Sequence, residues 1–229
     1  MNVHDETKAT RPLRVLVADD HPVVRAGMVA LLEQETSLRV VFEASDGSQA
    51  VTGWQLHAPD VGLIDLRMPV LDGFGAIEAI RRDARHARLI VMTTLCGDED
   101  VYRALQVGAS GYLLKDCCRQ ELVACVRAVA QGQKYLQPVA AARLADRVAS
   151  ADLTAREGDV LRWLAEGHSN KAIARQLGVA EGTVKTHMKG LLAKLEAGSR
   201  TQAVRLALQR GLVRLQEAKD SQAGPAPRS

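Results

Sequence analysis

The sequence predicts an α/β domain with a doubly wound, five-stranded parallel sheet, followed by a smaller all-α domain. Over roughly the first 130 residues, short apolar runs alternate with stretches in which apolar residues recur at helical spacing. The runs are almost continuously apolar, which is typical of strands that are buried on both faces of a sheet. Beyond residue 133 the strand pattern stops. A length of 229 residues with 47% hydrophobic side chains accommodates two globular domains.

Five apolar runs predict the strands of the sheet, in the order Leu13–Ala18, Val40–Glu43, Val61–Ile64, Leu89–Met92 and Gly111–Leu114. The intervening stretches predict helices over residues 22–35 and near 47–57, 73–83, 99–107 and 119–131. In the first of these, Val24, Met28, Leu31 and Leu32 have the spacing that places apolar side chains on one helix face. Strands that alternate with such helices favour parallel pairing, because each helix returns the chain to the same end of the sheet.

The predicted domain boundaries lie where these patterns change. Gln137-Pro138 interrupts the chain before a short helix over Val139–Val148, and the segments that follow have helical character. Thr154–Glu157 has the form of a capping box, Ser199–Gln202 is a second, and Gly211 is a suitable C-terminal stop for the last helix. The predicted segments are an α/β domain over 12–132, a linker over 133–150, a helical domain over 151–216 and a disordered tail over 217–229.

The charges are distributed unevenly along the chain, although the net charge is only +3. Residues 1–150 carry 17 basic and 19 acidic side chains, whereas residues 151–229 carry 13 basic and 8 acidic ones. Only the second part therefore has the positive surplus that suits a polyanion. Because no run of roughly 18 apolar residues is present and the N-terminus is acidic, we expect a cytoplasmic protein without a membrane anchor. The four cysteines show no zinc-binding spacing, and we expect reduced thiols.

Acidic and polar side chains follow four of the predicted strands. Asp19 and Asp20 end the first strand, Asp65 the third, Thr93 the fourth and Lys115 the fifth. In a doubly wound sheet these ends converge on one pocket. Clustered carboxylates repel one another, so a hard cation such as Mg²⁺ would stabilise them. A carboxylate can also attack a phosphoryl group, whose charge the cation, Lys115 and a Thr93 hydroxyl would stabilise.

A structural interpretation competes with this one at the first strand. Asp20-His21-Pro22 also has the form of a helix N-cap with proline in the first turn, and His21 suits a residue that starts a helix better than a base. The joint placement at four strand ends favours the pocket. No glycine-rich nucleotide-binding motif is present in the sequence.

In combination these segments resemble the receiver domain of two-component response regulators, which has a flavodoxin-like fold. The resemblance rests on four segments, Asp19–Pro22, Ile64–Gly73, Thr93 and Gly111–Asp116. It implies that Asp65 is the phosphoacceptor, that Asp20 binds Mg²⁺ directly and Asp19 indirectly, and that the Arg67 carbonyl is a further ligand. It also implies that Lys115 pairs with the phosphoryl group, that Thr93 and Tyr112 form a switch pair, and that a sensor histidine kinase is the donor.

The basic half contains a predicted helix-turn-helix. Residues 169–177 and 181–189 have helical character and are joined by the three-residue turn Gly178–Ala180. On a helical wheel Val184, Met188, Leu191, Leu192 and Leu195 share the core face, and the opposite face holds Gly182, Thr186, Lys189 and Ala193. Between Gly167 and Leu195 there are five basic side chains against one acid. A small, basic helix face suits the major groove of DNA, although packed helices with a solvated lysine face are the plain alternative.

This half resembles the LuxR-type helix-turn-helix of the NarL/FixJ response regulators. The match is carried by Leu153–Glu157, Gly167–Lys171 and Gly182–His187. It implies that Lys185, Thr186 and Lys189 reach into the groove, that Lys171 and Thr183 contact the backbone, and that the helix over about 200–211 forms a dimer surface. Ala180 at the N-cap and Gly190 inside the second helix depart from good helix chemistry, at about 1 kcal/mol each.

We therefore predict a transcription regulator, not an enzyme, that is switched by phosphorylation of Asp65 and binds two-fold related DNA half-sites as a homodimer. One alternative is a DNA-binding regulator that works independently of phosphorylation and has an idle pocket. A second alternative is an aspartate-nucleophile phosphatase, which needs a second acid two residues after the nucleophile. Asp65 is followed by Leu66-Arg67, so that acid is missing.

Overall fold

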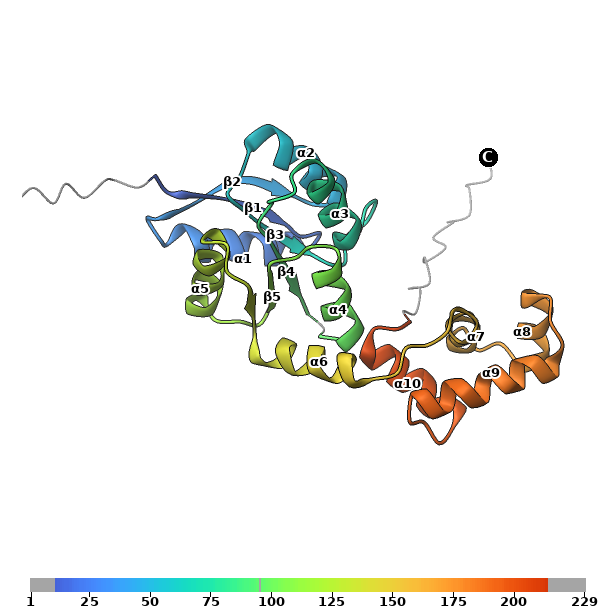
Figure 1. Ribbon diagram of the computed structural model, residues 1–229. Coiled ribbons are helices and arrows are strands. Elements are labelled where there is room, and N and C mark those ends of the chain that lie inside the picture. Colours follow the sequence, from blue (N-terminus) through green and yellow to red (C-terminus); the bar gives the residue numbers. More distant parts are fainter. Residues whose placement is uncertain (1–10, 95, 214–229) are drawn as a thin grey trace, which may run out of the picture. The chain divides into compact units, whose positions relative to one another are not determined.

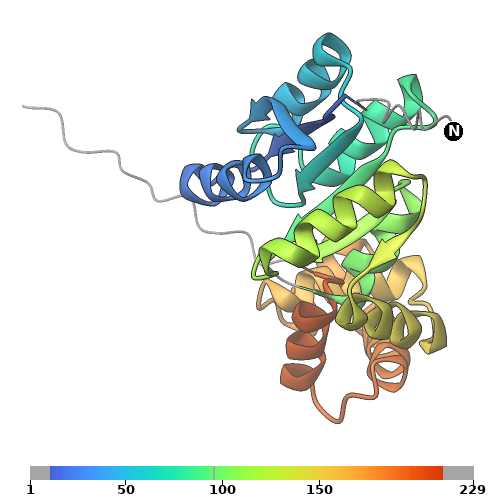
Figure 2. The ribbon, with the colours of Figure 1, turned by 90° about the vertical axis from the view of Figure 1, so that its left-hand side faces the viewer.

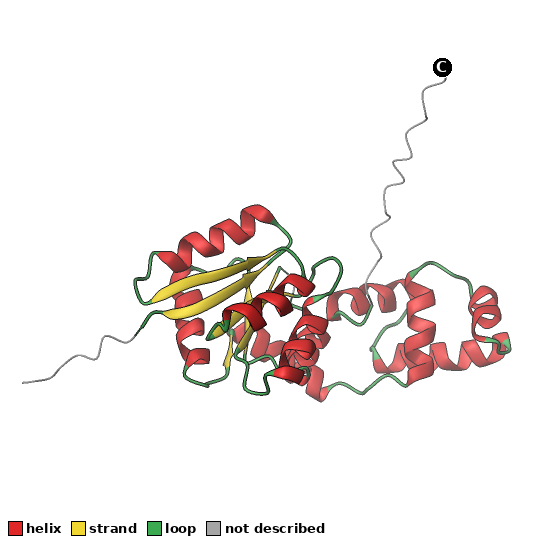
Figure 3. Cartoon of the chain, turned by 90° about the horizontal axis from the view of Figure 1, so that it is seen from above, coloured by secondary structure: helices red, strands yellow, loops and turns green. Residues whose placement is uncertain are grey.

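The computed structural model describes residues 11–94 and 96–213. The chain divides into two compact units, Met1–Ala149 and Ser150–Ser229, each with its own hydrophobic core (Figure 1). Strands occur in the first unit, and the described part of the second unit is helical (Figure 3). The predicted order of an α/β domain before an all-α domain is therefore confirmed. The predicted tail over 217–229 lies outside the described residues.

The first unit is built on a parallel sheet with the strand order β2-β1-β3-β4-β5-β6. The strands are β1 (Leu13–Ala18), β2 (Leu38–Ala44), β3 (Val61–Asp65), β4 (Leu89–Thr93), β5 (Gly111–Leu114) and β6 (Tyr135–Leu136). The chain runs from β1 outward to β2 and then crosses to β3 on the other side of β1. Ligands of such sheets bind at the carboxyl ends of the strands, where the order reverses, so the site is expected beyond β1 and β3.

Helices cover both faces of the sheet (Figures 1 and 2). Their bounds are α1 (Pro22–Glu33), α2 (Gly47–His57), α3 (Gly73–Asp83), α4 (Asp98–Gln106), α5 (Arg119–Ala130) and α6 (Pro138–Ala149). Alternate strand residues enter two separate cores, because Leu16 packs with α2, α3 and α4 while Val15 and Val17 pack with α1 and α5. All five helices predicted between and after the strands are present.

Residues 133–150, expected as a linker, differ from that expectation. Tyr135–Leu136 adds a sixth strand, which pairs in parallel with β5 through Gly111↔Tyr135 and Tyr112↔Leu136. The helix predicted over Val139–Val148 is present as α6, and it packs against α4 with Ala140 fully buried. The sheet thus has six strands rather than the predicted five, because a two-residue strand gives no periodic signal in a sequence.

Gln137 fastens this added segment to β5. Its side-chain Oε1 accepts a hydrogen bond of 2.6 Å from the backbone N–H of Leu114, and its own N–H donates to the carbonyl oxygen of Tyr112 at 3.3 Å. Gln137 is only 7% exposed, so water does not readily replace these bonds. The side chain therefore satisfies a backbone donor at the end of the strand that leads to Lys115.

Gln137→Ala should lower the free energy of unfolding of the first unit by about 1–3 kcal/mol, because the Leu114 N–H loses its buried acceptor. Trp54 lies in this unit, so urea unfolding can be followed by its fluorescence in a Trp163→Phe background. Gln133→Ala is the matched control, because Gln133 is exposed and its loss should change stability by less than about 0.5 kcal/mol. Equal effects of the two substitutions would contradict the structural role of Gln137.

The described part of the second unit consists of four helices around one core. These are α7 (Ala155–Ala165), α8 (Asn170–Leu177), α9 (Glu181–Lys194) and α10 (Arg200–Arg210). The predicted capping box at Thr154 and Glu157 is confirmed, and Gly211 ends α10 with a φ of +77°. The second predicted box is only half formed, because Ser199 accepts from Gln202 N while Gln202 Oε1 accepts from Gly198 N. Ala180 begins α9 without a side-chain cap, as predicted.

Gly190 has a packing role that explains its position inside α9. A Cβ at this position would overlap the carboxylate of Glu157, which reaches across from α7. Glu157 is buried, and its Oε2 accepts from the Thr154 N–H at 2.8 Å and from Lys194 Nζ at 2.7 Å. Lys194, counted above among the basic side chains of the helix-turn-helix, is therefore engaged in an internal ion pair.

Glu157→Gln should make the free energy of unfolding of the second unit depend less on pH in the acidic range. Burial alone would raise the pKa of Glu157, but Lys194 and the Thr154 N–H outweigh it and hold that pKa below its usual range. A depressed folded-state pKa stabilises the fold above the unfolded pKa of about 4.3, and this stabilisation is lost as the pH falls further. Trp163 fluorescence in a Trp54→Phe background measures this unit, and exposed Glu196→Gln is the control that should retain the wild-type profile.

Candidate functional site

The predicted pocket residues meet at the carboxyl ends of the strands. Asp19 follows β1, Asp65 ends β3 and Lys115 follows β5. Lys115 Nζ lies 2.7 Å from Asp19 Oδ2 and 2.9 Å from Asp65 Oδ2, so one cation bridges two carboxylates from different strands. Asp19 is fully buried and Asp65 is 2% exposed. The geometry thus brings together the side chains that the strand ends predicted.

Local backbone contacts fix the two buried carboxylates. Asp19 Oδ1 accepts a hydrogen bond of 2.9 Å from the N–H of His21, and the Asp65 carboxylate accepts one from the N–H of Arg67. Gly73, at the start of α3, packs so closely on the Asp65 carbonyl that a Cβ would overlap it. Gly73 was not among the site residues predicted from the sequence, and its one signal there is its place after Asp72, whose side chain caps α3.

Burial and charge act in opposite directions on the two central groups. Burial raises the pKa of Asp65 above its usual range, and the contact with Lys115 only partly offsets this. For Lys115 burial alone would lower the pKa, but the carboxylates of Asp19 and Asp65 outweigh it and raise the pKa. Lys115 therefore stays charged at neutral pH, and Asp65 is a poorly solvated carboxylate beside it.

The pocket has free coordinating capacity for a cation. Asp19 Oδ2, Asp20 Oδ1 and Asp65 Oδ2 are buried and accept no hydrogen bond from the described residues, although Lys115 and His21 lie within ion-pair distance of them. One donor atom from each of Asp19, Asp20, His21 and Asp65 lies within 4.8 Å of the others. Buried carboxylate oxygens in such a cluster suit a hard divalent cation.

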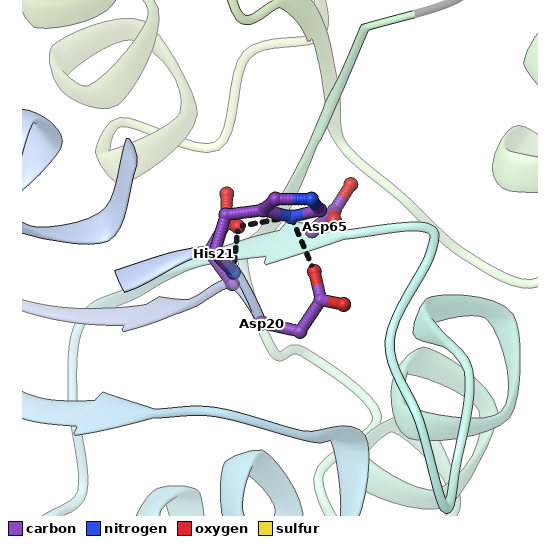
Figure 4. Close-up of side chains that lie close together, drawn as sticks. Asp20, His21 and Asp65 are labelled. Carbon is purple, nitrogen blue, oxygen red and sulfur yellow. Dashed lines mark hydrogen bonds and ion pairs between the residues drawn. The ribbon is translucent and has the colours of Figure 1, made fainter. Parts of the chain in front are cut away.

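Asp20 does not act as the helix cap that was its alternative interpretation. The N-cap of α1 is His21, which makes no side-chain capping bond, and Pro22 occupies the first turn. His21 therefore starts the helix, as predicted, but its Nδ1 also lies 2.7 Å from Asp20 Oδ1 (Figure 4). The predicted metal contact through the Arg67 carbonyl stays a prediction.

The predicted switch residues are both internal. Thr93 ends β4 and is 2% exposed, and Tyr112 is fully buried in the core that contains α4. Both strands end at the pocket, because Thr93 pairs with Leu114, the residue before Lys115. The structure thus links Tyr112 to the pocket through β5, while movement of the pair stays a prediction.

The exposed face of α9 has the composition that the helical wheel predicted. Val184, Leu191 and Leu195 are buried, whereas the proposed contact residues are all exposed, namely Lys171, Thr183, Lys185, Thr186 and Lys189. Lys185 Nζ lies 3.2 Å from Glu181 Oε1, and the Thr186 hydroxyl donates to the Gly182 carbonyl at 3.1 Å. Both contacts are at the surface and can be exchanged for a phosphate or a base.

Comparison with known proteins decides the class of both units. Residues 15–127 match the family described as response regulator receiver domain, and residues 151–207 match the LuxR family of bacterial regulatory proteins. The transcriptional regulatory protein LiaR of Bacillus subtilis is 37% identical over 209 residues, covering 88% of this chain and 99% of that protein. The chain belongs to the LuxR family of bacterial response regulators. It joins a receiver domain to a LuxR-type DNA-binding domain, as two-component transcription regulators do.

Other relatives of this response regulator agree with the assignment. The nitrate/nitrite response regulator protein NarP of Escherichia coli is 40% identical over 205 residues, covering 86% of this chain and 95% of that protein. The response regulator ChrA of a heme-sensing two-component system has a similar structure, with a TM-score of 0.55, 37% identity, and coverage of 89% and 100%. A complex of the response regulator RcsB with DNA gives a TM-score of 0.68 at 26% identity, with coverage of 87% and 99%.

LiaR is a transcriptional regulatory protein, and NarP is a response regulator protein. In the part of the chain that the structure describes, no helix is both long and apolar enough to cross a membrane.

Proposed function

We propose that Asp65 accepts a phosphoryl group from a histidine of a sensor kinase, and that this modification favours a DNA-binding homodimer. The observation that carries the proposal is the Asp65 carboxylate, 2% exposed and 2.9 Å from Lys115 Nζ, in a pocket that also holds the carboxylates of Asp19 and Asp20. Incubation with a radiolabelled small phosphodonor, followed by mapping of the labelled peptide, tests it. Label on the peptide that contains Asp65 supports the proposal, and its absence contradicts it.

In the proposed reaction an Asp65 oxygen forms a bond to phosphorus while the phosphorus–nitrogen bond of the donor phosphohistidine breaks. The electron pair of that bond leaves with the donor imidazole, and Asp65 becomes an acyl phosphate. In this proposal Lys115 Nζ, 2.9 Å from Asp65 Oδ2, stabilises the added phosphoryl charge, and the hydroxyl of Thr93, at the end of β4, donates to a phosphoryl oxygen.

We assign Mg²⁺ to Asp20, Asp65 and the Arg67 carbonyl, with Asp19 acting indirectly. When bound, the cation neutralises phosphoryl charge. Asp19 fits the indirect role, because it is fully buried and its Oδ1 already accepts a hydrogen bond from the His21 N–H.

DNA binding is assigned to α8 and α9, with the exposed α9 residues Lys185, Thr186 and Lys189 in the major groove, and with Lys171 of α8 and Thr183 of α9 on the DNA backbone. A homodimer would read two-fold related half-sites. The proposed extents are 12–132 for the receiver and 151–216 for the DNA-binding domain. We also propose a cytoplasmic location, where a regulator meets both DNA and the kinase.

The two alternatives remain separable by experiment. A regulator with an idle pocket would bind DNA equally with and without a phosphodonor. A phosphatase would need a carboxylate two residues after Asp65. In this chain Asp65 is followed by buried Leu66 and then by exposed Arg67, which is not an acid. Turnover of a chromogenic phosphate ester would favour the phosphatase.

Lys189→Ala should weaken DNA binding, because Lys189 lies on the exposed, small-residue face of α9. If its charge neutralises one phosphate, the slope of log K against log salt should shrink by about 0.9 and the loss should be uniform across sequences. If Lys189 reads guanine, discrimination at one base pair should fall by about 1–3 kcal/mol instead. Fluorescence anisotropy over a salt series distinguishes the two.

Arg162→Ala is the control of equal charge, because Arg162 is exposed on α7, outside the helix-turn-helix. It should leave the slope and the sequence discrimination nearly unchanged. Equal effects of the two substitutions would mean that α9 is not the reading helix.

A further inference from the structure

His21 lies beside the carboxylates of the receiver pocket, although the proposed function gives it no role. Its Nδ1 is 2.7 Å from Asp20 Oδ1 and 3.5 Å from Asp19 Oδ1. In Figure 4 a dashed line joins the imidazole ring of His21 to the carboxylate of Asp20, and Asp65 is drawn in the same view. The side chain is 66% exposed, so it stands at the mouth of the pocket while Asp19 and Asp65 lie at its base.

The backbone holds the imidazole of His21 in this place. Its N–H donates to Asp19 Oδ1 at 2.9 Å, and its carbonyl accepts from the Arg25 N–H at 3.0 Å. Pro22 follows in the first turn of α1, where its ring restricts the backbone. The backbone of His21 is therefore fixed beside Asp19. The short histidine side chain then places Nδ1 close to the carboxylates.

We propose that His21 Nδ1 is a ligand that makes the receiver pocket a mixed nitrogen and oxygen site for divalent transition-metal cations such as Co²⁺, Ni²⁺ or Zn²⁺. The inference goes beyond the proposed function, because it requires no phosphoryl transfer. Its geometric basis is that donor atoms of Asp19, Asp20, His21 and Asp65 lie within 4.8 Å of one another. Two ligands at right angles on a metal at about 2.1 Å are separated by about 3 Å, close to the 2.7 Å between His21 Nδ1 and Asp20 Oδ1.

A second observation shows that the pocket has coordinating capacity left. Asp65 Oδ2 and Asp19 Oδ2 are buried and accept no hydrogen bond from the residues that the structure describes. Lys115 contacts both, so a cation that enters must share them with one ammonium group. Three carboxylates against one ammonium leave a net negative charge that favours a divalent cation.

The choice between cations follows from the chemistry of the nitrogen ligand. Imidazole is a good ligand for Zn²⁺, Ni²⁺ and Co²⁺, whereas Mg²⁺ prefers oxygen ligands and retains water. His21 should therefore strengthen binding of the transition metals and contribute little to Mg²⁺. Because the carboxylates are shared, the two kinds of cation should compete for one pocket.

The test is the binding of Co²⁺ to the full chain, followed by its visible absorption and by calorimetry, in wild type and His21→Ala. We expect the substitution to weaken Co²⁺ binding about tenfold or more and to change Mg²⁺ affinity less than about twofold. Excess Mg²⁺ should displace Co²⁺ from the wild type competitively. This distinguishes Co²⁺ bound in the pocket from Co²⁺ bound at other histidines. Exposed His86→Ala is the matched control and should bind both cations as the wild type does.

Two results would overturn the proposal. Unchanged Co²⁺ affinity in His21→Ala would mean that the imidazole is not a ligand. An equal loss of Co²⁺ and Mg²⁺ would mean that His21 only orients Asp20. Because His21 is mostly exposed, the alanine variant should fold, and its Mg²⁺ titration verifies the pocket. Phosphoryl labelling of the wild type in Mg²⁺ is measured in a separate experiment. If that labelling fails, the Co²⁺ binding data still test the role of His21.

Discussion

Asp65→Asn is expected to abolish phosphoryl uptake while the chain remains folded. The amide has nearly the shape of the carboxylate, so the packing at the end of β3 can be kept, but it is not a nucleophile toward phosphorus. The wild-type pKa of Asp65 is raised, chiefly by burial, so the native state binds this proton more tightly than the unfolded chain does. The ionised carboxylate therefore costs stability at neutral pH, and its removal should not destabilise the fold on that account.

The matched control is Asp72→Asn, in the same loop. Asp72 Oδ1 accepts from the Gly75 N–H at 2.8 Å to cap α3, and an asparagine oxygen can accept the same bond. This variant should take up label as the wild type does. Intact-protein mass spectrometry after treatment with a small phosphodonor measures both variants. Full labelling of Asp65→Asn would mean that Asp65 is not the phosphoacceptor.

Lys115→Met is expected to have the largest effect on stability. Lys115 Nζ bridges Asp19 and Asp65, and the lysine side chain is only 8% exposed. Removing one partner of a buried ion pair leaves uncompensated charge and costs about 3–5 kcal/mol. Urea unfolding of the receiver domain, followed through Trp54 in a Trp163→Phe background, measures the loss. Because a divalent cation would supply the missing charge, added Mg²⁺ should restore part of the stability.

Lys134→Met controls for the removal of a lysine from the same domain. Lys134 Nζ donates to the carbonyl of Ala109 at 2.7 Å but contacts no carboxylate in the described structure. Its loss should cost about 1 kcal/mol and should not be rescued by Mg²⁺. A stable Lys115→Met without Mg²⁺ would mean that the carboxylates of Asp19 and Asp65 do not depend on this cation.

The sequence predicted most of the receiver domain because its signals are local. The strands are nearly continuous apolar runs, and alternation with helices specifies parallel pairing. Parallel strands present their carboxyl ends at one edge, so Asp19, Asp65 and Lys115 could be placed together before any contact was known. Exposure along α9 was equally predictable, because Val184 and Leu191 repeat at helical spacing.

The remaining features depend on contacts between distant segments. The two residues of β6 carry no period, and next to them Gln137 also bonds to β5. Gly190 looked like a weakness of α9, yet it makes room for Glu157 from α7, which also pairs with Lys194. The approach of Gly73 to the Asp65 carbonyl likewise follows from packing that no spacing rule contains.

The most direct test of the central claim is the DNA affinity of the full chain before and after phosphorylation. The probe is a duplex that the chain itself selects from a random pool, and anisotropy is measured at fixed salt. Phosphodonor with Mg²⁺ should raise the affinity of the wild type about 5- to 150-fold, the range of a coupling of about 1–3 kcal/mol, and should leave Asp65→Asn unchanged. Equal affinity of the wild type with and without the donor, despite a labelled Asp65, would contradict the account and favour a regulator that works independently of phosphorylation.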